Sequence, residues 1–301
     1  MQGITIGTAE RADDIRQRLA AELHFLQDEG IDVRIDLVNR GRYTFLGLDL
    51  SRAGAAPPEA ETAARVRHSV ANAVSDVIVE KWEKNLIRKI IRGNYYYFSP
   101  DEQDTIAGYA DRNLCAPDPV ERRGLYKISR KSKILHKLRD YLDQADELVV
   151  EGFVTFRLRE YLDELEEAVD RAVDDFLMER EYKEFVRLLR YFVEAQEPRL
   201  DRVHVLMQGP ATFRLVDDDG NAIKSEYLEE FVVEMVDSEI NYEDLLISAL
   251  ITLAPHAITL HSEGNEGWDE GVETIKAVFG DRVRLCRGCD LCAVAPVIGT
   301  H

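Results

Sequence analysis

The feature that most constrains the fold is a long run of helical hydrophobic spacing in the middle of the chain. Val70, Val74, Ile78, Trp82 and Leu86 recur every four residues, which places them along one stripe of a helix. The same spacing predicts further helices over about 100–114, 120–145, 148–180 and 182–195. A chain of 301 residues with this pattern is predicted to be predominantly helical.

The predicted helix 148–180 has two faces of opposite character. Its apolar stripe is Leu165, Val169, Ala172, Val173, Phe176 and Leu177. Its other face is acidic and is predicted to face water; it carries Glu160, Asp163, Glu164, Glu167, Asp170 and Asp174. The predicted neighbouring helix 182–195 has its own apolar residues, which we expect to pack against that stripe: Phe185, Leu188, Leu189 and Phe192.

Mixed segments flank the helical middle. The first fifty or so residues read as strand, helix and a two-stranded hairpin, and the Pro-containing stretch 53–60 reads as a linker. After Glu197-Pro198 the spacing changes to alternation around 203–207 and 213–215. Helices over 225–236 and 242–253 follow, and the chain then closes with a β-α-β unit that spans 257–285.

The predicted fold class is therefore α+β, predominantly helical, with mixed α/β segments at both ends. We divide the chain into a β-α-β-β segment 1–52, a helical region 61–197 and an α+β segment 198–292 that ends in a cysteine cluster. The two flanking segments could share one sheet, with the helices as an insertion, or form separate sheets. The sequence leaves both arrangements open.

Composition narrows the classes of partner. A net charge of −19 disfavours general attraction to nucleic acid or to anionic membranes. The longest apolar run, Leu245–Pro255, is about half the length that a membrane-spanning helix needs. The N-terminus has no basic region followed by an apolar stretch. The chain has 4 cysteines, three of them near one end, which suits a reducing cytoplasm better than a disulfide framework.

One segment departs from this acidic balance. From Lys81 to Arg139 there are 14 Lys or Arg and 7 Asp or Glu, a net charge of +7, and Tyr95–Phe98 precede the densest basic part at 122–139. Basic and aromatic residues together can bind nucleic acid. We consider this basic segment better explained by pairing with the protein's own acidic helices, notably 160–181. A nucleic-acid partner is therefore not expected.

Several blocks of the sequence are similar to those of a known family. They are EGFVTFRLREYLDELEEAVDRAVDDFLMEREYKEFVRLLRYFV (151–193), EPRLDRVHVLM (197–207), DLLISALITLAPHAITLH (244–261) and the cysteine-bearing end after Phe279. In order and spacing they resemble the YtxC-like family of endospore-forming bacteria. This resemblance implies a sporulation protein. It implies no activity, cofactor or catalytic residue.

The sharpest local motif is Cys286-x2-Cys289-x2-Cys292. Thiolates at this spacing can converge on one ion, as in zinc and iron–sulfur sites, and Gly288 would ease the turn between them. A bacterial ferredoxin motif would continue with cysteine at position 296, which is Pro296 here. The fourth ligand would be an external group or one of Cys115, His256, His261 and His301. Three reduced thiols with no metal are the alternative.

Two loops resemble ligand sites and lack essential features. The run Asp217–Asn221 is acidic and contains Gly220, but the residues before it alternate as in a strand, so we interpret it as a tight turn without calcium. The loop 264–271 follows a strand and precedes a helix, but its carboxylates would repel a phosphate.

Two classes of function follow. The preferred interpretation is a non-enzymatic cytoplasmic interaction or regulatory protein with protein partners, since neither a Gly-x-Ser-x-Gly nor a His-Glu-x-x-His motif occurs. The alternative is a zinc or iron–sulfur protein that uses Cys286, Cys289 and Cys292. The sequence does not decide the oligomeric state.

Overall fold

The computed structural model describes residues 3–28, 31–52, 60–115, 123–207, 213–223, 242–261 and 269–293. The chain divides into two compact units, Met1–Met178 and Glu179–His301, which we call the N-terminal and C-terminal units. The linker predicted at 53–60, apart from Ala60 at the start of a helix, the helix predicted at 225–236 and most of the loop at 264–271 lie outside the described residues. The sequence-based division at 52, 61, 197 and 198 stays a prediction.

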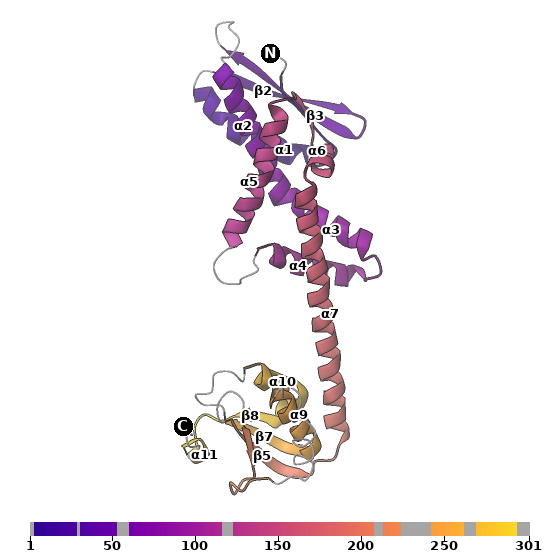
Figure 1. Cartoon of the computed structure of the whole chain (residues 1–301), viewed down its shortest axis with the longest axis vertical. Coiled ribbons are helices and arrows are strands. Elements are labelled where there is room, and N and C mark those ends of the chain that lie inside the picture. Colours follow the sequence, from indigo (N-terminus) through magenta and orange to yellow (C-terminus); the bar gives the residue numbers. More distant parts are fainter. Residues whose placement is uncertain are drawn as a thin grey trace. The chain divides into compact units, whose positions relative to one another are not determined.

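The N-terminal unit contains a small sheet and a set of helices, drawn in indigo to rose in Figure 1. Its elements are β1 (Thr5–Thr8), α1 (Ala12–Asp28), β2 (Ile31–Arg40), β3 (Tyr43–Arg52), α2 (Ala60–Val77), a π turn (Ile78–Trp82), α3 (Glu83–Asn94), α4 (Pro100–Cys115), α5 (Arg123–Leu142), β4 (Glu147–Val149), α6 (Val150–Arg157) and the first half of α7 (Arg159–Ala195). None of the described helices is apolar over a length that would cross a membrane.

The sheet of this unit has the strand order β2-β3-β1-β4. β3 is antiparallel to both β1 and β2, with Leu46 opposite Ile6 and Leu37. Because alternate residues of a strand face opposite sides, Ile6 and Leu46 lie on the buried face. The buried stripe of α1, which includes Ile15 and Leu19, belongs to the same core. The predicted β-α-β-β segment is confirmed.

Strand β4 was not expected, since residues from 148 onward were predicted to be helical. It pairs in parallel with β1, placing Leu148 opposite Ile6, and the amide of Thr5 donates to the carbonyl of Asp146 at 2.8 Å. The prediction was wrong at this end because local spacing cannot show an edge of β1 that becomes available only after folding. The helix begins at Val150 and is interrupted once, at Leu158.

The long helical stripe of the middle region is confirmed, with one irregularity. Val70, Val74 and Ile78 are fully buried and Trp82 is 8% exposed. Four residues of an α-helix turn about 400°, so a stripe with this spacing drifts around the helix. The π turn Ile78–Trp82 lies in the middle of the stripe and accommodates an extra residue there.

The C-terminal unit is built on a second sheet with the order β6-β5-β7-β8. Its elements are the end of α7, β5 (Leu200–Met207), β6 (Phe213–Val216), α9 (Tyr242–Leu253), β7 (Pro255–His261), α10 (Asp269–Phe279), a 3-10 turn (Gly280–Arg282), β8 (Val283–Leu285) and α11 (Asp290–Ala293), as Figure 1 shows. β6 is antiparallel to β5, whereas β5, β7 and β8 are mutually parallel. The predicted β-α-β unit is confirmed.

One face of this second sheet carries the core of the unit. Val203, Val205 and Met207 of β5 alternate onto that face and pack with residues of α9, α10 and the end of α7. The intervening residues, including His204, point to the other face. In the described part of the chain the two flanking segments form two separate sheets. The α+β, predominantly helical fold class is confirmed.

Helix α7 contradicts the prediction of two packed helices. It runs without a break from Arg159 to Ala195. Its first half behaves as predicted, since Leu165 and Val169 are fully buried and Phe176 packs against the same core. Residues 182–195 cannot fold back onto that stripe because they continue the same helix. Of the four apolar residues expected to pack on the stripe, Leu189 instead packs into the C-terminal core, together with Val186 and Val193. The other three are exposed: Phe185 by 53%, Leu188 by 57% and Phe192 by 54%.

A leucine-to-alanine change is therefore expected to lower the free energy of unfolding by different amounts in the two halves of α7. Leu165→Ala should lower the free energy of unfolding by about 2–5 kcal/mol, since it opens a cavity in a closed core. Leu188→Ala should change it by less than about 0.5 kcal/mol because the side chain is largely in water. Urea denaturation of the full chain measures both, and equal costs would contradict the exposed position of Leu188.

Candidate metal centre

The cysteine motif follows the last strand of the C-terminal sheet. His261 is the last residue of β7, and Cys286 comes directly after β8. The amide of Cys286 donates to the carbonyl of Leu260 at 2.8 Å, which continues the β7–β8 pairing and places Cys286 beside His261. Both residues thus lie at the carboxyl edge of parallel strands, where α/β sheets commonly bind ligands.

A tight turn brings the other two cysteines to the same place. Gly288 has φ +107, a backbone conformation that favours glycine. α11 then begins, and the amide of Cys292 donates to the carbonyl of Cys289 at 3.0 Å. The expected role of Gly288 in turning the chain between the cysteines is confirmed.

Four ligand atoms converge within 4.8 Å of one another: Nδ1 of His261 and the sulfurs of Cys286, Cys289 and Cys292. The Cys292 sulfur lies 3.7 Å from that of Cys286 and 3.8 Å from that of Cys289. His261 Nδ1 lies 3.3 Å from the Cys292 sulfur and 3.5 Å from the Cys289 sulfur. Sulfurs bound at about 2.3 Å to one tetrahedral Zn²⁺ would be about 3.8 Å apart, so the group has dimensions that could hold a metal ion.

Burial is uneven across the group. His261 is 5% exposed, Cys286 and Cys292 are half-buried and Cys289 is exposed. Burial, and to a lesser extent the nearby charge of His204, lowers the pKa of His261 and favours the neutral ring that binds metals. The backbone hydrogen bond from Cys292 lowers the pKa of Cys289, while burial raises that of Cys292 to about 11. A cation among them would favour all three thiolates.

The structure selects among the fourth ligands that the sequence left open. His261 joins the three cysteines. His256 is exposed on the same strand. The side chain of Cys115 and all of His301 lie outside the described residues.

Sequence reasoning missed two residues behind His261. Nδ1 of His204 lies 2.9 Å from Nε2 of His261, and Nε2 of His204 lies 2.9 Å from Oδ1 of Asp218. Asp218 belongs to the acidic turn 217–221, which is confirmed as a tight turn by the hydrogen bond from the amide of Gly220 to the carbonyl of Asp217. His204 alternates with buried valines on β5, and that register could have marked it as facing the other side of the sheet.

Comparison with known proteins assigns the family. The profile of the YtxC-like family matches residues 68–284. The chain belongs to the YtxC-like family. It is 26% identical over 267 residues to the uncharacterised protein YtxC of Bacillus subtilis (strain 168), covering 88% of this chain and 89% of that protein. No solved structure shows a significant match. The matched region includes His204 and His261 and ends just before Cys286.

The densest part of the basic segment, 122–139, lies largely in α5 of this YtxC-like chain, and its cations pair with acids of other helices, as expected. The pairs are Lys127–Glu80, Arg130–Glu83, Lys131–Asp76, Lys133–Glu164 and Lys137–Glu160. The acidic face of α7 therefore does more than contact water, since Glu160 and Glu164 neutralise α5. Such pairing competes with contacts to phosphate.

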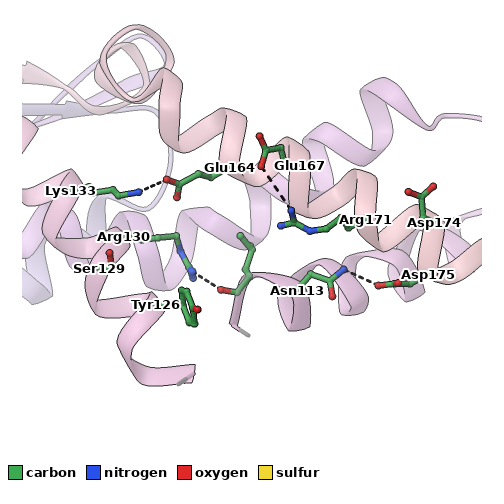
Figure 2. Close-up of a pocket in the computed structure, with 11 residues that line it drawn as sticks. Asn113, Tyr126, Ser129, Arg130, Lys133, Glu164, Glu167, Arg171, Asp174 and Asp175 are labelled. Carbon is green, nitrogen blue, oxygen red and sulfur yellow. Dashed lines mark hydrogen bonds and ion pairs between the residues drawn. The ribbon is translucent and has the colours of Figure 1, made fainter. Parts of the chain in front are cut away.

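A cleft in the N-terminal unit was not visible in the sequence. Figure 2 shows it between α4, α5 and α7, and its volume is about 790 Å³. Lys133 pairs with Glu164 across it, and Asn113 donates to Asp175 at 3.0 Å. Acidic and basic side chains are nearly balanced along the lining, so the cleft has no dominant charge that would select a ligand.

The pairing of α5 predicts weak interaction with nucleic acid. We expect the purified full chain to show no binding to single-stranded or double-stranded DNA or RNA that weakens steeply with added salt. Fluorescence anisotropy over a salt series measures this. Steep salt dependence that disappears in Lys127→Glu/Lys137→Glu and persists in the α7 change Lys183→Glu would contradict the expectation.

Proposed function

We propose that this YtxC-like protein binds one Zn²⁺ in its C-terminal unit through His261, Cys286, Cys289 and Cys292. The observation that carries the proposal is the convergence of four metal-binding atoms, from two strand ends and a turn, within 4.8 Å. Three thiolates and one imidazole are a donor set typical of zinc.

The spacing of the sulfurs favours a single ion over an iron–sulfur cluster. In a [4Fe–4S] cluster each cysteine binds a different iron, and in a [2Fe–2S] cluster an iron takes at most two cysteines, so three cysteine sulfurs do not gather around one iron. Here the Cys292 sulfur lies 3.7 and 3.8 Å from the other two. Distances this short suit ligands that share one metal.

Four protein ligands also favour a structural role. A catalytic zinc keeps one position open for water or substrate, whereas a Cys₃His set closes the tetrahedron. The proposed ion would tie the turn after β8 to the end of β7 and so hold α11 on the sheet. Cysteines that bind metal must stay reduced, and a reducing compartment keeps them so; we therefore propose a cytoplasmic location.

Metal analysis tests the site. The full chain, purified without oxygen, should contain close to one equivalent of zinc by mass spectrometry, and Cys292→Ser should lose it because one thiolate of the tetrahedron is gone. Cys115→Ser, which changes the remaining cysteine of the chain, is the matched control and should keep the metal. Zinc-free wild-type protein that also fails to take up added Zn²⁺ would contradict the proposal. Iron with sulfide would identify a cluster instead.

We further infer that the protein acts in sporulation by binding other proteins. The sporulation role is what the resemblance to the YtxC-like family implies. Protein binding is supported by a row of exposed apolar residues on one face of α7, formed by Phe185, Leu188 and Phe192. Exposed apolar side chains that gather on one helix face are typical of interaction surfaces. A non-enzymatic regulatory role is consistent with a zinc site that has no open position.

Spore counts test this second role. In an endospore former that carries only the variant, Leu188→Gln/Phe192→Gln should lower spore counts because the apolar row is lost, while protein abundance and thermal unfolding stay unchanged. Ile128→Gln, which is 63% exposed on α5, is the control and should be neutral. Normal sporulation of the stable double variant would exclude the α7 row, and normal sporulation after deletion would exclude the role itself.

A further inference from the structure

A chain of hydrogen bonds leads from the proposed zinc site to the protein surface. His261 directs Nδ1 toward the thiols and Nε2 toward Nδ1 of His204, 2.9 Å away. Nε2 of His204 in turn contacts Oδ1 of Asp218 at 2.9 Å. Exposure to solvent increases along the way: the residue His261 is 5% exposed, and the side chains of His204 and Asp218 are 13% and 55% exposed.

The sheet register sets the first contact. β5 and β7 are parallel neighbours with Leu206 opposite His261, so His204, two residues earlier on β5, points to the same face. The core residues of both strands point to the opposite face. His204 is therefore a diagonal neighbour of His261, on the side of the sheet where the cysteines gather.

Asp218, at the surface end of this series of hydrogen bonds, is also held in place. Asp218 accepts a second hydrogen bond from Arg202 at 3.1 Å. The preceding residue fixes the turn, since Oδ1 of Asp217 accepts from the amides of Asp219 at 3.0 Å and Asn221 at 2.8 Å. The carboxylate of Asp218 is therefore held toward His204 by a turn that hydrogen bonds fix.

Metal binding would allow one arrangement of protons along this chain. If Nδ1 of His261 gives its lone pair to the ion, its proton resides on Nε2 and is donated to Nδ1 of His204. His204 must then carry its own proton on Nε2 and donate it to the Asp218 carboxylate. Every nitrogen of both rings has a partner in this arrangement. A carboxylate behind a metal-binding histidine orients the ring and strengthens the ligand.

We propose that His204 and Asp218 are positioning residues that fix the tautomer and orientation of His261 at the zinc site. This inference rests on the proposed zinc site and adds two residues that contact no metal. Outer-shell partners of this kind change metal affinity by about 10–100-fold. His204→Leu removes the acceptor, so it should weaken Zn²⁺ binding by about that factor. His204→Asn, whose side-chain oxygen can take the place of Nδ1, should restore part of it.

The experiment uses the full chain and Zn²⁺ itself. Competition with a chromophoric chelator gives affinities for wild type, His204→Leu, His204→Asn and Asp218→Ala. His256→Leu, on the same strand as His261, is the matched control and should bind as wild type. In parallel, long-range ¹H–¹⁵N spectra of the zinc-loaded wild type should show His261 bound through Nδ1 with its proton on Nε2, and His204 protonated on Nε2. A merely structural role would not set these tautomers.

The outcomes separate the two proposals. A wild type that binds no Zn²⁺ overturns both the zinc site and the positioning role of His204 and Asp218. A wild type that binds Zn²⁺, with His204→Leu at wild-type affinity or His261 bound through Nε2, overturns the positioning role and leaves the zinc site standing. The wild-type spectra decide the tautomers even if His204→Leu fails to fold.

Discussion

The N-terminal unit depends on a buried ion pair between Glu83 and Arg130. Arg130 donates to both carboxylate oxygens, at 3.0 and 3.1 Å, and to the carbonyl of Leu114 at 2.7 Å. Tyr161 donates to the same carboxylate at 3.0 Å, and burial, followed by the charge of Glu83, raises the pKa of that phenol well above its usual value. Charges removed from water are tolerated only with such complete hydrogen bonding. The pair therefore requires α3, α4, α5 and α7 to meet at one point.

The C-terminal unit has its own polar centre, on the opposite side of the sheet from its apolar core. A metal held by His261 and the three cysteines would fix the chain after β8, where a three-residue strand offers little pairing of its own. Ligand assembly of this kind contributes directly to folding. The chain from His261 through His204 to Asp218 would then couple the turn after β6 to the same centre. Both units thus combine a closed apolar core with one polar site that specifies how the surrounding elements meet.

Helix α7 shows which features local hydrophobic spacing can predict and which it cannot. Its buried stripe around Leu165 and Val169 was predicted correctly because 3.6-residue spacing is a local property. The break predicted near residue 181 was wrong. The sequence already argued against it, because Phe176 to Phe185 contains neither glycine nor proline and consists largely of good helix formers. Two apolar stripes in succession can lie on two packed helices or on one long helix. Spacing alone does not distinguish these, whereas the lack of a breaker favours the single helix.

The sequence by itself determined the predominantly helical α+β class, the two mixed ends, the family and the three clustered cysteines. These depend on spacing and residue type over short stretches. The tertiary structure decided which histidine joins the cysteines, that β4 completes the first sheet, and that Asp218 faces His204. His261 was one of four candidates because all were equivalent in the sequence; parallel pairing of β7 with β8 brings it within 3.3 Å of the Cys292 sulfur. Contacts between residues far apart in the chain follow from strand order and register, and neither is encoded in any single segment.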